Sequence, residues 1–157
     1  MFAPVLLLLL AQSAAIDSKY LTLTPSAGAQ AVPGARVTLA LDVSPKPTIH
    51  VYAPGQPDYM PISLTLEADP MYHRAGHPRY PKPEIFFFRP LNERFKVYSK
   101  PFRIAQDVVV STDARGNTPG ASVVVKGKVS YQACDDAVCY LPVDVPVAWT
   151  VRLRSLK

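Results

Sequence analysis

Cysteine, glycine and charged residues are all scarce in this chain of 157 residues, and each shortage excludes a class of protein. Two cysteines are too few for a disulfide-dense miniprotein or a four-cysteine zinc site. Charged residues make up 18% of the chain and hydrophobic residues 48%, a balance that supports a packed core and excludes a disordered tail. The sequence also lacks a glycine-rich phosphate loop, an H-E-x-x-H motif and a G-x-S-x-G motif.

Proline is abundant by contrast, with 17 residues, and it leaves little room for long helices because each proline removes a backbone donor. The net charge is +5, and the lysines and arginines are scattered rather than clustered. A nucleic-acid-binding role would need a basic stripe with interleaved aromatic residues. We therefore expect a mildly basic protein with few helices that binds no nucleic acid.

The N-terminal segment is typical of a secretory signal peptide. Val5–Leu10 is an uninterrupted apolar run, and small residues at Ser13 and Ala15 precede a cleavage site. The run is much shorter than the roughly 20 residues that span a bilayer, and Met1–Pro4 lacks the basic residue that usually begins a signal peptide. We expect cleavage near Ala15, a single mature domain over residues 16–157 with no membrane span, and export to the periplasm or another oxidising compartment.

Alternation of apolar and polar residues dominates the rest of the chain and predicts strands with one buried and one solvated face. The clearest runs are Val37–Val43, Ile62–Ala68, Val123–Tyr131 and Val145–Leu153, and the shorter candidates are Tyr20–Thr24, Thr48–Tyr52, Phe95–Tyr98 and Phe102–Val110. Turn residues such as Pro33-Gly34 and Pro54-Gly55 separate these runs. About eight short strands with frequent breaks predict an all-β fold, an immunoglobulin-like antiparallel β-sandwich, with a β-barrel as the second choice.

Two segments between the strands are expected to be loops. Asp69–Glu84 is rich in proline and predicts a long irregular loop, and Asp113–Gly120 predicts a polar one. The first carries His73 and His77, a spacing that has little geometric meaning in a loop. Because a metal site needs several specific ligands, we interpret both histidines as solvated and expect no bound metal and no other cofactor.

Cys134 and Cys139 are the residues most informative about function. They flank Asp135-Asp136, which favours a tight turn after the Val123–Tyr131 strand. Cysteines on either side of a tight turn can reach the ~5.5 Å Cα separation that a disulfide requires. Such a bond would contribute only about 2 kcal/mol to the stability of the fold, because the loop that it closes is short. Its position fits a structural staple and an exchangeable bond equally well.

The two aspartates bear on the reactivity of this pair. Negative charge beside a thiol disfavours the thiolate, so Asp135 and Asp136 are expected to raise the pKa of the neighbouring cysteines. A redox-active pair of this kind would initiate exchange poorly by itself. A more nucleophilic thiolate on a partner would attack its disulfide, and the reduced thiols would react only in a docked complex.

The segment Tyr131-Gln132-x-Cys134 … Cys139-Tyr140-x-Pro142 resembles the N-terminal periplasmic domain of the thiol:disulfide interchange protein DsbD. The resemblance extends weakly over most of the mature chain. It implies an immunoglobulin-like fold in which Cys134 and Cys139 are the redox pair and Cys139 forms the intermolecular mixed disulfide. It also implies thioredoxin-like partners, a membrane-linked reductant and the activity of a protein-disulfide reductase component.

The resemblance further places residues around the cysteines. In the family, aromatic residues on a strand lie beside the active site, and a phenylalanine on a cap loop shields the disulfide. The matching positions here are His50 and Tyr52 on the strand and Leu91 at the cap, with Phe88 nearby; at least one residue of Phe86–Phe88 is expected to be ordinary core. With the cysteine segment included, the expected surround is His50, Tyr52, Phe88, Leu91, Tyr131, Asp135, Asp136 and Tyr140.

Some features depart from the family and leave other functions open. Leu141-Pro142 stands where the family commonly has two prolines, and the cysteines are closer together than in its best-known member. We expect no membrane conduit or thioredoxin-like domain after Lys157 and therefore expect another protein to supply the reductant, and the direction of electron flow stays open. The alternative function is a non-catalytic immunoglobulin-like interaction module with a structural disulfide. A third hypothesis is copper or zinc handling by the two cysteines with His50.

Overall fold

Strands dominate the computed structural model, which describes residues 14–28, 30–114 and 121–154. The one helix among these residues is the short 3-10 turn η1 (Arg89–Leu91). The strands are β1 (Ile16–Asp17), β2 (Leu21–Ala27), β3 (Arg36–Pro45), β4 (His50–Tyr52), β5 (Ser63–Leu66), β6 (Tyr72–Arg79), β7 (Glu84–Phe88), β8 (Glu93–Tyr98), β9 (Phe102–Val110), β10 (Ser122–Tyr131), β11 (Ala133–Cys134) and β12 (Val143–Arg152). Every strand predicted from alternation is present, with bounds that differ by a few residues.

The predicted signal peptide lies mostly outside the described residues, which begin at Ala14. Strand β1 begins at Ile16 and pairs with β2. The predicted loop over Asp113–Gly120 also falls partly outside, since residues 115–120 are not described. Within the described ranges, no helix is long and apolar enough to cross a membrane. The cleavage site and the single mature domain therefore stay predictions.

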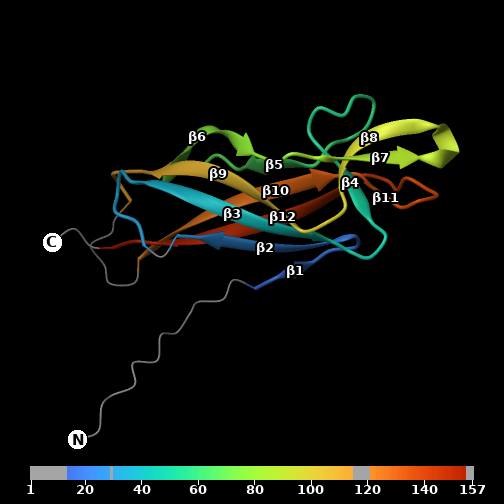
Figure 1. Cartoon of the computed structure of the whole chain (residues 1–157). Helices are drawn as coiled ribbons and strands as arrows, with labels where there is room; N and C mark the ends of the chain where they lie inside the picture. Colours follow the sequence, from blue (N-terminus) through green and yellow to red (C-terminus); the bar gives the residue numbers. More distant parts are fainter. Residues whose placement is uncertain (1–13, 29, 115–120, 155–157) are drawn as a thin grey trace, which may run out of the picture.

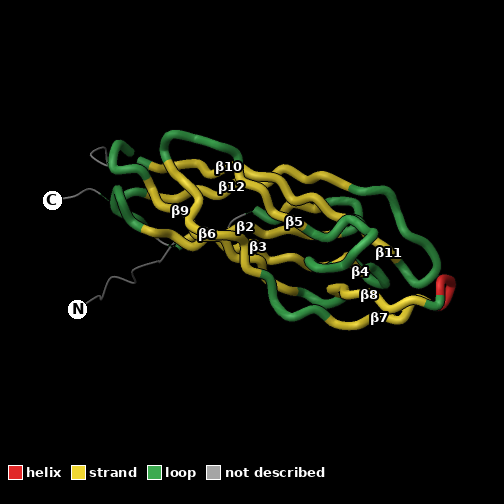
Figure 2. Tube along the Cα trace, turned by 90° about the horizontal axis from the view of Figure 1, so that it is seen from above, coloured by secondary structure: helices red, strands yellow, loops and turns green. Residues whose placement is uncertain are grey.

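Two antiparallel sheets form the layers of a sandwich (Figures 1 and 2). One has the strand order β1-β2-β3-β9-β6 and the other the order β12-β10-β5. A third sheet, in the order β11-β4-β8-β7, lies at one end of the sandwich. It is connected directly to the second layer, since Gln132 is the one residue between β10 and β11. The fold is an immunoglobulin-like antiparallel β-sandwich, as predicted, and these sheets are open rather than closed into the alternative barrel.

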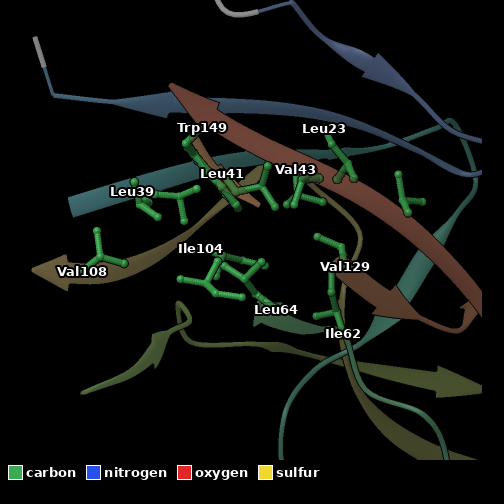
Figure 3. Packing of buried hydrophobic residues seen from close by; sticks show 14 of the residues in the cluster. Leu23, Leu39, Leu41, Val43, Ile62, Leu64, Ile104, Val108, Val129 and Trp149 are labelled. Atoms are coloured by element: carbon green, nitrogen blue, oxygen red, sulfur yellow. The ribbon is translucent and has the colours of Figure 1, made fainter. Parts of the chain in front are cut away.

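Alternating apolar side chains fill the space between the two layers (Figure 3). The buried positions of β3, for example, are Val37, Leu39, Leu41 and Val43. Burying each such side chain stabilises the fold by roughly 1.5–3 kcal/mol. Trp149 of β12 is also buried here, and its indole N–H donates to the Ala40 carbonyl at 2.7 Å. Neither cysteine belongs to this main core, so the sandwich does not depend on the pair for its packing.

The prediction of a long irregular loop over Asp69–Glu84 is wrong. Half of this segment is strand β6, which forms the edge of the five-stranded sheet by pairing with β9. The pairing shifts register around Gly76, whose φ of 83° suits glycine and interrupts the regular ladder. Tyr72 is the one buried residue of β6, so the strand shows no apolar alternation in the sequence.

Polar side chains of β6 face solvent or pair across the sheet edge. His73 and His77 are exposed, as interpreted from the sequence, although they lie on a strand and not in a loop. Arg79 donates to the carboxylate of Asp107 on β9 at 3.0 Å, which lowers the pKa of Asp107 to about 2. This ion pair joins the edge strand to its neighbour.

The third sheet has two apolar faces with different roles. Because side chains alternate along a strand, one face carries Val51, Tyr98 and Ala133, which belong to the main core. The opposite face carries a second buried group, which we call the aromatic cluster: Tyr52, Phe88, Phe95, Val97 and Cys134. The first cysteine therefore lies on the face of the sheet that is turned away from the main core.

Candidate functional site

The two cysteines lie opposite each other across a tight hairpin after β11. Cys134 and Cys139 form an antiparallel bridge, so their side chains point to the same side of the hairpin. The turn between them is closed by a hydrogen bond from the Asp135 N–H to the Val138 carbonyl at 3.0 Å. Both cysteines carry free thiols in this structure. The local sequence thus brings the pair together within one tight turn.

Asp135 stabilises the turn through its carboxylate. Its Oδ1 accepts the N–H groups of Ala137 and Val138, each at 2.8 Å. Its Oδ2 accepts the hydroxyl of Tyr140 at 2.6 Å. The Tyr140 bond, followed by the two backbone bonds, lowers the pKa of Asp135 to about 2, and the same contact raises the pKa of Tyr140 to about 12. Asp135 is therefore charged and engaged in the turn at neutral pH.

One buried thiol and one exposed thiol share a single hydroxyl group. Cys134 is 1% exposed, whereas Cys139 faces solvent. The thiol of Cys134 donates to the hydroxyl oxygen of Tyr52 at 3.2 Å, and the same oxygen lies 3.2 Å from the Cys139 sulfur. Tyr52 is itself buried on β4, next to β8 in the sheet. The site is thus asymmetric, because an attacking group reaches Cys139 first.

Burial controls the acidity of the inner thiol more than the neighbouring aspartates do. Burial raises the pKa of Cys134 to about 12, followed by the hydrogen bond with Cys139, while the charge of Asp135 contributes least. A hydrogen bond from Tyr52 opposes this shift, and burial raises the pKa of Tyr52 as well. The direction predicted from the sequence holds for Cys134, but its main cause is burial and not Asp135 and Asp136.

Tyr59, which no sequence pattern indicated, covers the aromatic cluster from the loop between β4 and β5. Its ring stacks on Tyr52 with centroids 4.5 Å apart and meets Phe95 edge-on at 4.9 Å. Gln132 holds the loop, because its side-chain oxygen accepts the N–H of Met60 at 3.3 Å. These contacts join distant parts of the chain, so no local motif could have identified Tyr59.

The two expected cap residues lie in different environments. Phe88 is buried and packs on Phe95, with ring centroids 5.8 Å apart, inside the cluster that contains Cys134. Leu91 lies in η1, in the turn between β7 and β8, and is 51% exposed. The structure therefore brings Phe88, as a core residue, into the cluster around the inner cysteine, while Leu91 lies outside that cluster.

The two tyrosines that flank the cysteine segment also differ. Tyr131 is part of the main core, and its hydroxyl pairs with Ser18 Oγ at 3.0 Å. Tyr140 binds Asp135 in the turn and stacks on Tyr20 with ring centroids 4.6 Å apart. Tyr140 thus supports the hairpin directly, whereas Tyr131 packs in the main core, to which neither cysteine belongs.

His50 stands opposite Cys134 in the pairing of β4 with β11. It is 3% exposed, and its ring packs against Phe86 with centroids 4.1 Å apart. Its Nε2 is buried and has no hydrogen-bond partner among the described residues. Burial lowers the pKa of His50 below its usual 6.5, and the carboxylate of the exposed Asp136 is the largest influence opposing this shift.

A ligand set for a metal ion is absent from the described ranges. No group of three or more His, Cys, Asp or Glu side chains in them is placed to hold a metal. The hypothesis of copper or zinc handling by the cysteines with His50 therefore gains no support from the geometry. The reactive groups that the described residues bring together are the thiols of Cys134 and Cys139, the phenol of Tyr52 and the imidazole of His50.

The fold and the site together define a β-sandwich protein with a cysteine pair in a hairpin at one end. Residues 19–148 match the family model described as "Thiol:disulfide interchange protein DsbD, N-terminal". The match covers most of the chain and includes both cysteines. The chain belongs to this family, which confirms the resemblance seen in the sequence. A search of curated proteins gives no match.

A solved structure with the same fold is the N-terminal periplasmic domain of ScsB from Proteus mirabilis. The two chains are 12% identical with a TM-score of 0.55, and the alignment covers 88% of this chain and 50% of that one. At this identity the likeness shows the fold alone. This chain therefore spans about half the length of the ScsB chain to which it is similar.

Proposed function

We propose that this protein exchanges thiols and disulfides in the periplasm and carries reducing equivalents between thioredoxin-like partners. The observation that carries the proposal is the pairing of an exposed Cys139 with a buried Cys134 at one hydroxyl of Tyr52. Membership of the DsbD N-terminal family supports a role in thiol–disulfide interchange. The activity proposed is that of a protein-disulfide reductase component.

Cys139 is the sulfur through which we expect exchange to begin. In the oxidised form, a partner thiolate attacks Cys139 Sγ, the Cys134–Cys139 bond breaks, and a mixed disulfide forms between Cys139 and the partner. Cys134 leaves as a thiolate, which a hydrogen bond from Tyr52 stabilises until it takes up a proton. A second partner thiol then displaces Cys139, so the pair gains two electrons and the partner becomes a disulfide. The reverse sequence passes both electrons to the next partner.

The surface around the hairpin supports docking of a protein. Among the described residues, four of the seven large apolar side chains that are exposed lie in η1 or in the loops at the hairpin end of the third sheet: Met60, Leu91, Val138 and Leu141. Exposed apolar residues that gather in this way mark contact sites for other proteins. We expect thioredoxin-like proteins to dock there, because attack on Cys139 requires a thiol to be held against the hairpin.

The proposed location and electron source follow from the family. Family membership, the likeness to a periplasmic domain and the apolar segment Val5–Leu10 support export to the periplasm. A carrier in that compartment needs a reductant, and we propose a membrane-linked protein as the donor. The sulfur atoms hold both electrons, so the proposed reaction requires no cofactor.

A second candidate function is a non-catalytic interaction module in which the two cysteines form a structural disulfide. The burial of Cys134 favours it, because a shielded sulfur resists exchange. This candidate predicts a reduction potential below about −300 mV for the pair. The first candidate predicts a higher potential, close to that of other carriers of the same compartment.

Serine variants of the two cysteines test the first candidate. A disulfide-bearing, thioredoxin-like partner is mixed with each reduced variant, and the products are separated on nonreducing gels and weighed by mass spectrometry. Cys134→Ser is expected to accumulate the mixed disulfide through Cys139, because no inner thiol remains to resolve it. Cys139→Ser is expected to trap at least about tenfold less, because Cys134 is buried.

Each variant serves as the matched control for the other, since each retains one thiol in the same fold. Equal trapping by both variants would contradict the proposed order of attack. The exchange function itself fails if the wild-type disulfide resists a reduced thioredoxin-like donor that turns over a standard exchange substrate in the same buffer.

A further inference from the structure

A buried imidazole and a buried thiol face the same side of the third sheet. His50 and Cys134 are direct partners in the antiparallel pairing of β4 with β11. Side chains at such positions have Cβ atoms about 4.5–5.5 Å apart. His50 is 3% exposed and Cys134 1% exposed, so bulk water has little access to either group. A proton leaving the Cys134 thiol therefore needs an acceptor inside the protein.

The imidazole of His50 has a nitrogen available for this purpose. Its Nε2 is buried without a hydrogen-bond partner among the described residues. Buried polar atoms are almost always paired, so an unpaired one requires an explanation. When Nδ1 carries the ring proton, Nε2 presents a basic lone pair. A free base paired across the strands with a thiol that must ionise during exchange provides that explanation, with the bond to the sulfur formed in the docked complex, as catalytic hydrogen bonds often are.

The other groups near Cys134 suit this task less well. Burial raises the pKa of Tyr52, and its hydroxyl is already bonded to the Cys134 thiol. The carboxylate of Asp135 accepts three hydrogen bonds in the turn and has a pKa of about 2, which makes it a weak base. His50 is the group beside Cys134 that combines burial with an unused acceptor.

We propose that His50 is the general base that accepts the proton of Cys134 when Cys134 resolves the mixed disulfide on Cys139. The Cys134 Sγ–Cys139 Sγ bond forms, the bond between Cys139 and the partner sulfur breaks, and the partner leaves as a thiolate. The pair loses two electrons to the partner, and the Cys134 proton moves to His50 Nε2. In the reverse direction the imidazolium returns this proton to the Cys134 thiolate. The proposal rests on the exchange function proposed above and adds the residue that handles its proton.

The charges that face His50 suit a base that is neutral at rest. Burial lowers its pKa below 6.5, so the imidazole is uncharged at pH 7 and free to accept a proton. Three carboxylates oppose this shift and stabilise the imidazolium once it forms: Asp135 and Asp136 from the hairpin, and Glu84 from β7. Lys100, 4.0 Å from Glu84, partly offsets that charge. Tyr52 and Cys134 are the remaining titratable neighbours on β4 and β11.

An aromatic disulfide reports the two halves of the reaction separately. The reduced protein is mixed with one equivalent of 5,5′-dithiobis(2-nitrobenzoate), and thiolate release is followed by stopped flow. The first phase is attack by the exposed Cys139, and the second is release of the remaining chromophore by Cys134. In wild type, the second rate is expected to rise with pH through the pKa of His50 and then reach a plateau, because only the neutral imidazole accepts a proton.

The variant His50→Gln separates base catalysis from packing. At pH 7 its second phase is expected to slow about 100-fold while the first phase is unchanged, since general bases contribute at least that factor. Its second rate is expected to rise about tenfold per pH unit without a plateau near neutrality, because the reaction then depends on the rare Cys134 thiolate. His73→Gln, on the exposed face of β6, is the matched control and should behave like wild type in both phases.

A measurement on the wild-type protein keeps the proposal open to test if His50→Gln does not fold. The His50 ring is titrated by NMR in the reduced protein, and its pKa should coincide with the midpoint of the second phase. A second phase that is independent of His50, or whose midpoint differs from that pKa, overturns the general base and leaves the exchange function standing. A wild-type protein with no second phase overturns both.

Discussion

Tyr52 contributes one oxygen atom that contacts both thiols, and it lies two positions from His50 on the same strand. Strand alternation therefore places both side chains on the face that carries Cys134. In the proposed mechanism, the hydroxyl of Tyr52 and the imidazole of His50 have different roles at the sulfur of Cys134. The first stabilises the thiolate by a hydrogen bond, and the second has a free nitrogen that can hold its proton.

Removing this hydroxyl should slow exchange without disturbing the fold. Tyr52→Phe keeps the ring in the aromatic cluster but removes the hydrogen bond to the Cys134 thiolate. We expect the reduced pair to be oxidised by glutathione disulfide about tenfold more slowly at pH 8, which corresponds to one lost hydrogen bond to a charged group. Tyr59→Phe is the control, because its hydroxyl faces Glu93 at 3.4 Å and not a sulfur. Equal rates for the two variants would contradict a role for the Tyr52 hydroxyl.

The sequence predicted individual site residues unevenly, for physical reasons. The cysteines, His50 and Tyr52 could be located because a local turn and a short strand position them. Tyr131 was expected beside the cysteines, yet the alternation that predicts β10 already places it with Val129 on the inward face. The free nitrogen of His50 depends on packing against distant strands, and no pattern within the chain reports such packing.

At the scale of elements, β7 shows how adjacent residues of one type acquire different roles. Phe86 and Phe88 point to the face of the third sheet that carries the aromatic cluster. Phe87 points to the opposite face of this sheet, outside the main core, and is 48% exposed. The triplet offers no alternation of residue type, so the sequence alone could not assign its faces. The pairing of β7 with β8 makes the assignment, because Phe86 stands opposite Phe95.

Alanine variants of two neighbouring phenylalanines test this assignment. Phe88→Ala is expected to lower the free energy of unfolding by about 3–5 kcal/mol, because it leaves a cavity in the aromatic cluster. Phe87→Ala is expected to change it by less than about 0.5 kcal/mol, because the side chain is half exposed. Urea denaturation followed by circular dichroism measures both. Similar losses for the two variants would show that the faces of β7 are assigned incorrectly.

The strands with one buried face were predicted from the sequence, whereas the edge strand β6 was not. Strands β3, β10 and β12 alternate because their inward side chains fill the main core, and this burial makes them visible in the sequence. Strand β6 buries Tyr72 alone and is held by backbone pairing with β9 and by the Arg79–Asp107 ion pair. Backbone pairing leaves no trace in residue type, so the segment resembled a loop.

At the scale of the whole molecule, the sandwich and the cysteine pair are nearly independent. The main core spans both layers and contains neither cysteine, so the packing of the sandwich does not pass through the pair. The exchange function proposed above requires a protein that stays folded in both redox states. The division between core and site meets this requirement, because closing or opening the short loop changes little in the packing of the sandwich.

Reduction of the pair should therefore lower the melting temperature only modestly. A disulfide that closes so short a loop contributes about 2 kcal/mol, which corresponds to about 4–8 °C for a domain of this size. Calorimetry of the oxidised and reduced protein measures the difference, and the double variant Cys134→Ser, Cys139→Ser should melt close to the reduced form. Loss of a cooperative transition on reduction would contradict the independence of core and pair.

Trp149 is the one tryptophan in the chain, and it is packed in the main core with its N–H bonded to Ala40. Tyr52 and Tyr59, in contrast, stack on each other beside the sulfurs. Light absorbed by tryptophan alone thus reports the state of the sandwich, whereas the tyrosine band sums eight rings, of which these two lie beside the sulfurs. Fluorescence excited in the tryptophan alone therefore follows loss of the fold from inside the sandwich, in a region that contains neither thiol.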